Sequence, residues 1–101
     1  MIPESQIERL GCAVFCYPNY PMEVVGDLHQ HFDVDNLYDT ISICAAHAQS
    51  RRLKTFGLTY TTWCFVGEES VKDNYQTCGA SVDCAHNTYG TDDSIFVFAL
   101  K

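Results

Sequence analysis

One helix stands out in the hydrophobic pattern of the chain, between about Asn36 and Gln49. Its apolar residues recur every three to four positions, which places them along one face of a helix; they are Leu37, Ile41, Cys44 and Ala48. Asp33 or Asp35 is suited to cap the start of this helix, and three cations within residues 51–54 follow its end, where the helix dipole favours positive charge. The pattern therefore predicts a helix whose buried face includes Cys44.

Short β-rich runs surround this helix. Four segments carry the β-branched and aromatic residues that are typical of strands: Gly11 to Tyr17, Thr55 to Tyr60, Trp63 to Val66 and Ser94 to Leu100. Side chains alternate along the first of them, so Cys12 and Cys16 are expected on one face. For residues 3–10 the sequence predicts either a short amphipathic turn or a frayed leader. Residues 22–31 are expected to be irregular, and residues 71–90 to be rich in loops.

Together these elements predict an α+β fold. We expect a small disulfide-rich domain in which a short, twisted antiparallel sheet wraps one central helix. The length of 101 residues suits one domain, and the sequence contains no repeat, linker or low-complexity tract. We place the domain at residues 11–101 and an N-terminal extension at residues 1–10.

The six cysteines are an even number and a high one for this length, which points to about three disulfides and an oxidising compartment. Zinc is the alternative, because Cys12 and Cys16 are close enough to form half a site and a mixed site with His86 is conceivable. Cys78 and Cys84, however, are too far apart to complete a four-cysteine knuckle. We therefore predict disulfides in a secreted, extracellular protein, with no cofactor.

Charge and motif content exclude several classes of partner and activity. Thirteen acidic and six basic residues give a formal net charge of −7, which disfavours nucleic acid and anionic membranes. The longest apolar run, Ile95 to Leu100, is too short to span a bilayer, so we expect no membrane insertion. The sequence carries no hydrolase elbow, phosphate-binding loop or metalloprotease helix, and bridged cysteines would leave no thiol nucleophile. We therefore predict that the protein is not an enzyme.

Four groups of residues occur in an informative order. They are Gly11-Cys12, the helix segment Ile41-Ser42-Ile43-Cys44-Ala45-Ala46, the strand segment from Phe56-Gly57-Leu58 through Trp63-Cys64 to Gly67, and the closing stretch from Cys78 and Cys84 to Ile95-Phe96-Val97-Phe98. In order and spacing they resemble the WSC domain, a relative of the PAN and apple modules, over roughly residues 11–98. The resemblance implies a PAN/WSC-like fold, an extracellular location, and binding of carbohydrate, protein or a cell surface.

The chain departs from the usual WSC pattern in its cysteines. Members of the family carry further cysteines where this chain has Ala48, Val66 and Tyr89, whereas Cys16 is an addition. The positions of Ala48 and Val66 are plausible partners in the family. Their joint replacement would therefore remove one bridge without leaving an orphan thiol.

The pairing of the cysteines can be predicted in part. Cys44 lies on the buried stripe of the helix and Cys64 on a strand, so we expect these two to bond, closing a loop of about twenty residues. Two separate buried thiols are the alternative. The remaining four, which are Cys12, Cys16, Cys78 and Cys84, are expected to link the first strand to the late loop in two bridges. A local Cys78–Cys84 bridge is the competing arrangement.

Aromatic rings offer stacking platforms for sugars, and flanking polar groups can bind hydroxyls. The candidate ligand-binding residues are Tyr20, Tyr75, Tyr60 and Trp63, with Tyr17 and Tyr89 as further candidates. We expect Tyr20 and Tyr75, which lie in loops among Asn and Asp, to be the more exposed. Trp63, beside Cys64, is expected to pack over a disulfide. An ordinary place in the core or the sheet is the alternative for most of these rings.

Histidine and aspartate groups offer weaker signals. His29 and His31 could form a metal pair with Asp27 or Asp33, although a solvated loop is the favoured interpretation. The acidic stretches at residues 33–36 and 91–94 could bind calcium, but they lack the glycine and the distal glutamate of an EF-hand loop. Turns and helix caps explain them, so we predict no metal site.

Two functions from different classes fit these observations. The first is a non-enzymatic extracellular recognition module, carbohydrate-binding or adhesive, whose partner is a glycan or an extracellular protein. The second is a structural protomer of an extracellular polymer or surface coat. The final strand, Ser94 to Leu100, is apolar on both faces, so an open edge there could pair with a second copy to form a homo-oligomer, unless the chain's own core covers it. Asp92 and Asp93 would guard such an edge by charge repulsion.

Overall fold

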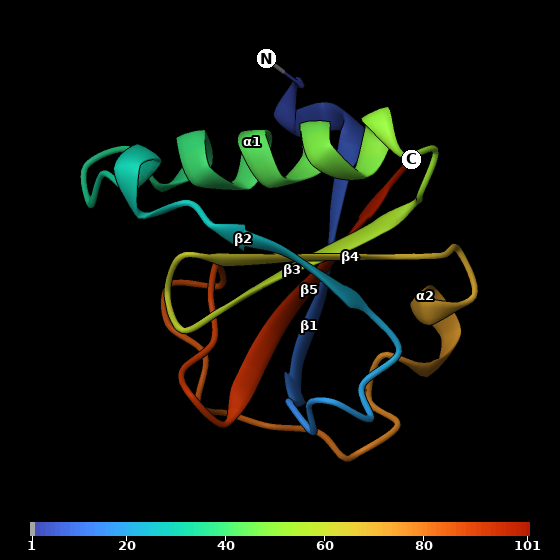
Figure 1. The fold of residues 1–101 in the computed structure, drawn as a ribbon. Coiled ribbons are helices and arrows are strands. Elements are labelled where there is room, and N and C mark those ends of the chain that lie inside the picture. The colour runs from blue at the N-terminus through green and yellow to red at the C-terminus, as the bar shows by residue number, and fades with distance from the viewer. Residues whose placement is uncertain (1) are drawn as a thin grey trace.

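A five-stranded antiparallel sheet with one main helix across one face forms the protein (Figure 1). The computed structural model describes residues 2–101. Along the chain the elements are β1 (Ile7–Val14), β2 (Glu23–Asp27), α1 (Leu37–Ser50), β3 (Thr55–Thr59), β4 (Trp63–Gly67), a short α2 (Val71–Asn74) and β5 (Ser94–Leu100), with 3-10 turns at Glu4–Gln6 and His29–His31. The predicted α+β fold with one central helix is confirmed.

The strands lie in the order β1-β5-β3-β4-β2, and every neighbouring pair is antiparallel. The last strand of the chain, β5, therefore returns to the inside of the sheet, between β1 and β3. The chain's own core covers this strand, which is the alternative that the sequence slightly favoured, and β5 pairs with a neighbour on both sides, so it leaves no open edge. Strand β5 therefore offers no free edge through which a homo-oligomer could form. For the same reason Asp92 and Asp93 have no edge from which to repel a second copy.

Helix α1 begins and ends within one residue of its predicted bounds. Asn36 occupies the N-cap position and makes no side-chain capping bond. The Asp33 carboxylate instead accepts a hydrogen bond from the backbone N–H of Asp35 at 2.9 Å. The prediction that Asp33 or Asp35 caps the helix is wrong, because the chain first makes a separate turn and reaches the cap position only at Asn36.

Residues 7–10 lie in the sheet, after the 3-10 turn at Glu4–Gln6. For residues 3–10 we predicted a turn or a frayed leader, but Ile7 to Leu10 form the first half of β1, and Ile7, Glu8 and Arg9 pair with β5. Ile7 lies opposite Leu100 and is buried in the core beneath α1. The register shifts between Arg9 and Gly11, and Gly11 has a φ of +148°, which glycine adopts without a steric penalty. The amphipathic pattern of this segment is that of a half-buried strand.

Strand β2 is an element that the sequence pattern did not predict. Its five residues pair with β4 at the edge of the sheet. Charged residues stand at both ends, and Gly26 accompanies a shift of register after Val24. The segment therefore lacks the regular alternation that marks a strand in a sequence.

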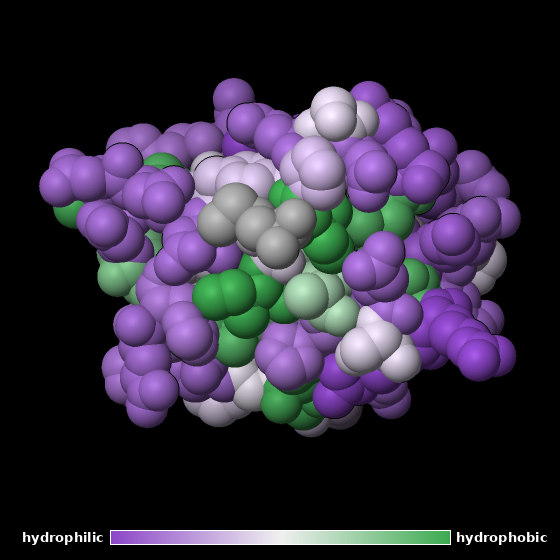
Figure 2. Space-filling model, turned by 90° about the horizontal axis from the view of Figure 1, so that it is seen from above, coloured by the Kyte–Doolittle hydropathy of each residue, from purple (hydrophilic) through white to green (hydrophobic). Residues whose placement is uncertain are grey.

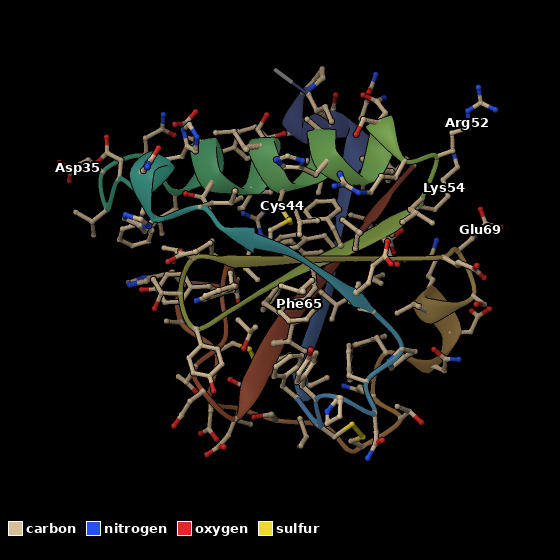
Figure 3. The ribbon with its side chains drawn as sticks, in the orientation of Figure 1. Asp35, Cys44, Arg52, Lys54, Phe65 and Glu69 are labelled. Carbon is tan, nitrogen blue, oxygen red and sulfur yellow. A yellow bond between two sulfur atoms is a disulfide. The ribbon has the colours of Figure 1, made fainter. Side chains whose placement is uncertain are left out.

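The larger part of the core lies between α1 and the sheet. Inward-facing side chains of α1, β3, β4 and β5 supply most of it; among them are Ile41, Cys44, Ala45, Ala48, Phe56, Leu58, Cys64, Val66, Phe96 and Phe98. The rings of Phe56 and Phe98 stack with their centroids 4.9 Å apart. In Figure 3, Cys44 lies between α1 and the sheet, where its disulfide to Cys64 joins α1 to β4.

A second core covers the opposite face of the sheet. It contains Ala13, Tyr20, Met22, Phe65, Val71, Ile95 and Val97, and loops together with α2 close it from outside. Figure 3 shows Phe65 on this side of the sheet, away from α1. Gly57 of β3 is required here, because a Cβ at this position would lie 2.8 Å from Cδ1 of Ile95.

Three disulfides join all six cysteines: Cys12–Cys84, Cys16–Cys78 and Cys44–Cys64. The predicted Cys44–Cys64 pair is confirmed, as are the two bridges from the first strand region to the late loop. The prediction that Cys12 and Cys16 share one face is wrong. Strand β1 ends at Val14, so Cys16 follows in a loop and packs against the second core, whereas Cys12 packs against the first.

Candidate functional site

An open groove of about 680 Å³ lies on the face of the sheet opposite α1, beside the β3–β4 hairpin. Its lining combines five aromatic side chains with one aliphatic and two acidic ones: Phe15, Tyr17, Tyr60, Trp63, Phe65, Val24, Asp92 and Asp93. We call this surface the aromatic groove. The α1 side presents hydrophilic residues around its margin and several hydrophobic residues across its middle (Figure 2).

Alternation along β4 places two of the rings in the groove. Trp63 and Phe65 face one side of the sheet, and Cys64 between them faces α1. On the neighbouring edge strand, Val24 stands opposite Phe65 in the register and lines the same groove. The prediction that Trp63 packs over a disulfide is wrong, because adjacent residues of a strand point to opposite faces and the bridge lies on the other side.

The segment after β1 supplies two further rings. Phe15 and Tyr17 stack with their centroids 5.8 Å apart, and each contacts Phe65 edge to face. Cys16 stands between them and is bonded to Cys78, while the N–H of Phe15 donates to the carbonyl of Asp93 at 3.0 Å. A disulfide and a backbone hydrogen bond therefore hold this segment against β4.

The β3–β4 hairpin presents Tyr60 at the rim. Tyr60 and Thr61 have φ values of +49° and +68°, in the left-handed region, where a non-glycine residue costs about 1 kcal/mol or more. Their N–H groups donate to the carbonyls of Thr91 (3.1 Å) and Gly90 (3.0 Å). The loop before β5 thus holds the hairpin in this conformation, and strained backbone of this kind concentrates at functional sites.

The same loop carries the two acidic residues. The Thr59 hydroxyl contacts the carbonyls of Thr91 (2.8 Å) and Ser94 (2.6 Å), and the Ser94 hydroxyl accepts the N–H of Thr91 at 2.8 Å. Asp92 and Asp93 stand exposed between these anchored ends. None of the six Lys and Arg residues of the chain lines the groove.

The groove leaves three of its rings open to solvent. Tyr17 is 57% exposed, Tyr60 53% and Trp63 39%, while Phe65 beneath them is buried. Large aromatic side chains in a folded protein are usually well covered, so an exposed group of them beside a concave surface is a candidate binding site. Chemically, the groove offers ring faces for stacking and carboxylates that accept hydrogen bonds or pair with a cation.

Tyr20 and Tyr75, predicted as exposed ligand-binding residues, lie outside the groove. Tyr20 is only 3% exposed, and its hydroxyl donates to the backbone carbonyl of Tyr75 at 2.5 Å. Tyr75 is half-buried, and its hydroxyl donates to the carbonyl of Leu10 at 3.0 Å. The prediction fails because a loop tyrosine whose hydroxyl finds a backbone partner can be buried. Burial, with the nearby Tyr75, raises the pKa of Tyr20 well above its ordinary value.

The structure thus brings together Tyr60 and Trp63 from the predicted set, joined by Tyr17. Tyr89, the other further candidate, is half-buried and packs against Phe32 with ring centroids 5.9 Å apart. The prediction missed Phe15, Val24, Phe65, Asp92 and Asp93 as groove residues. Alternation along residues 63–65 indicates that Trp63 and Phe65 share a face. No local pattern in the sequence, however, predicts that the loop with Asp92 and Asp93 lies beside them.

The histidine pair does not converge on one site. Nδ1 of His29 lies 3.3 Å from the Asp27 carboxylate. Asp27 also accepts a hydrogen bond from the Thr62 hydroxyl, and this bond is the main cause of a pKa below the ordinary carboxyl value, supported by the contacts with His29. Within residues 2–101, no three His, Cys, Asp or Glu side chains are grouped to hold a metal ion.

Comparison with known proteins adds no relative. A scan against models of protein families finds no match to the chain, and a search of curated proteins finds none either. Over the residues that the structure describes, none of the helices is both long enough and apolar enough to cross a membrane.

Proposed function

We propose that this protein is a secreted, non-enzymatic recognition module that binds carbohydrate in the aromatic groove. The observation that carries the proposal is the exposure of Tyr17, Tyr60 and Trp63 around one concave surface. The three disulfides are consistent with an extracellular protein. The resemblance of the chain to WSC domains supports the same function.

The physical argument is one of complementary surfaces. The C–H face of a pyranose ring is apolar and stacks on an aromatic ring, while its hydroxyls need hydrogen-bond partners at the edge. Tyr60 and Tyr17 can supply both a ring and a hydroxyl, and Asp92 and Asp93 supply acceptors. Because disulfides and the clamped loop hold these groups before a ligand arrives, little ordering entropy is lost on binding.

The aromatic groove also suits a polymer better than an isolated small molecule. It is open rather than enclosed, and its residues come from three separate parts of the chain, around residues 15–24, 60–65 and 92–93. An open surface of this kind can accept the middle of a glycan chain as well as its end. The alternative of a structural protomer loses its supporting observation, because β5 has neighbours on both sides.

A glycan array that contains glucans, mannans and animal glycans tests the proposal. We expect binding by the wild type and at least about a tenfold loss in Trp63→Ala and in Tyr60→Ala, with Tyr60→Phe retaining part of the affinity because the ring remains. Val82→Ala is the matched control, since Val82 is an exposed apolar residue outside the groove. Silence across the array, or equal binding by all variants, would remove this function.

A further inference from the structure

The aromatic groove carries unbalanced negative charge. Asp92 and Asp93 line it, and all six Lys and Arg residues stand elsewhere. The three ion pairs found within residues 2–101 use the carboxylates of Glu4, Glu8 and Asp27, so neither groove aspartate is neutralised by a neighbour. Arg52 and Lys54 lie near the C-terminal end of α1, on the far side of the sheet from the groove (Figure 3).

The aromatic rings of the groove also favour a positively charged ligand. The face of Trp, Tyr or Phe carries partial negative charge, so it attracts a cation that lies over it. Tyr17, Tyr60 and Trp63 expose their rings in the same surface that holds Asp92 and Asp93. Rings and carboxylates together are complementary to a ligand that has an apolar face and a positive group at its edge.

We infer that the aromatic groove selects sugars that carry a free amine, such as 2-amino-2-deoxyhexose units in an unacetylated polymer. This inference rests on the proposed carbohydrate-binding function. The pyranose faces stack on Tyr60 and Trp63, and the ammonium groups pair with Asp92 and Asp93. Acetylation of the amine removes the charge and hence the preference, and acidic sugars are repelled both by these carboxylates and by the net charge of −7.

An amino sugar fits these observations better than a lysine side chain of a protein partner. A lysine presents its charge at the end of a flexible chain, whereas an amino sugar fixes the amine beside a flat apolar face. The groove offers several exposed rings next to its carboxylates, which suits a rigid ligand with repeated apolar faces. A lysine-rich peptide is therefore a competing ligand to be measured in the same experiment.

Trp63 makes the test direct, because it is the only tryptophan in the chain and its fluorescence reports on the groove alone. Three hexasaccharides with the same backbone linkage, of glucosamine, N-acetylglucosamine and glucose, are titrated against the wild-type protein. They differ only in the group at the second carbon, which is an amine, an acetamide or a hydroxyl. We expect the glucosamine hexamer to bind at least about tenfold more tightly than the other two at low salt, and this preference to shrink between about 0.05 M and 0.5 M NaCl.

A pair of double variants separates the groove from general charge attraction. Asp92→Asn with Asp93→Asn should reduce the affinity for the glucosamine hexamer far more than the affinity for the glucose hexamer, because an Asn oxygen still accepts hydrogen bonds from hydroxyls but carries no charge to pair with an ammonium group. Asp35→Asn with Asp83→Asn removes the same two charges at exposed positions outside the groove, so it should preserve most of the preference. Circular dichroism confirms that all variants are folded.

Each contrary outcome has a distinct meaning. Equal affinity for the three hexamers would overturn the inference and leave the proposed carbohydrate binding intact. An equal loss in both double variants would overturn it too, because the preference would then come from net charge. Tighter binding of a lysine-rich peptide than of the glucosamine hexamer would replace the amino sugar by a protein partner, and no binding of any hexamer would remove both proposals.

Discussion

Phe15 and Phe65 pack edge to face, with ring centroids 4.9 Å apart and planes inclined by 70°. This contact joins the loop after β1 to the centre of β4, two segments that lie fifty residues apart in the chain. Phe65 forms the buried floor of the aromatic groove, and Phe15 supports Tyr17 at its rim. The pair therefore belongs both to the second core and to the lining of the aromatic groove.

Replacement of Phe15 by Ala should affect stability and binding together. Phe15 is half-buried, so we expect a loss of about 2 kcal/mol, less than the cost of truncating a fully buried ring. Tyr17 loses its stacking partner, so ligand affinity should fall as well. Phe32→Ala is the matched control, because Phe32 is also half-buried and packs on Tyr89 away from the groove. Chemical denaturation should show both variants destabilised, and a binding titration should show only Phe15→Ala impaired; equal binding by the two would contradict the assignment.

Removal of the Cys16–Cys78 disulfide should loosen the groove more than the rest of the molecule. The bridge spans 62 residues, and in the chain-entropy model its loss destabilises the fold by about 4 kcal/mol. In Cys16→Ser with Cys78→Ser, we expect a lower melting temperature and a weaker response of Trp63 fluorescence to ligand. Hydrogen exchange should be faster at residues 15–17 than at α1, whose own bridge is intact. Uniform acceleration throughout the chain would show that this bridge does not act locally.

Gly57→Ala tests the close approach of β3 and β5 beneath the groove. The new Cβ would lie 2.8 Å from Cδ1 and 2.9 Å from Cγ1 of Ile95, and 3.0 Å from the carbonyl oxygen of Phe96. Such overpacking costs about 1–3 kcal/mol. Ile95→Val removes the nearest of these atoms, so the double variant should lose less stability than the two single variants added together. Strict additivity in denaturant unfolding would contradict the predicted clash.

The sequence predicts the elements that carry strong local signals. The helix stripe that includes Cys44, the hairpin of β3 and β4, and the apolar strand β5 all appear at or within one residue of their expected bounds. The Cys44–Cys64 bond follows from the first two of these elements. The helix has a clear period of hydrophobic residues, and the strands are rich in β-branched and aromatic residues; both are properties that the chain carries locally.

The features that the sequence did not predict have a different origin, because each depends on residues far away in the chain. The edge strand β2 is a strand through its pairing with β4, and β5 is internal because β1, about ninety residues earlier, takes its other side. Tyr20 can be buried because the carbonyl of Tyr75 accepts a hydrogen bond from its hydroxyl. Asp92 and Asp93 reach the groove because Thr59 clamps their loop. None of these relationships has a signature within one segment.

The hydrogen bond from Thr62 to Asp27 predicts a local dependence on acid. This bond, and the contacts of Asp27 with His29, hold the pKa of the Asp27 carboxyl below the ordinary 3.8. Because the folded-state pKa is lowered, the ionised carboxylate contributes stability above the unfolded pKa, and the contribution is lost as the pH falls through the folded pKa. NMR titration of the carboxyl carbon should therefore give Asp27 a pKa below 3.8, and Thr62→Val should raise it.

The variant Asp27→Asn isolates the same group in stability measurements. Its unfolding midpoint should lie below that of the wild type at neutral pH and converge with it as the pH falls through the lowered pKa of the folded state, where the wild-type carboxylate becomes protonated. Asp27 stands opposite Trp63 in the register of β2 and β4, so this bond pins the outer strand beside the groove. Asp35→Asn, at an exposed carboxylate in the turn before α1, should follow the wild-type curve throughout. A constant difference between Asp27→Asn and the wild type down to the lowest pH would show that the effect does not arise from ionisation of Asp27.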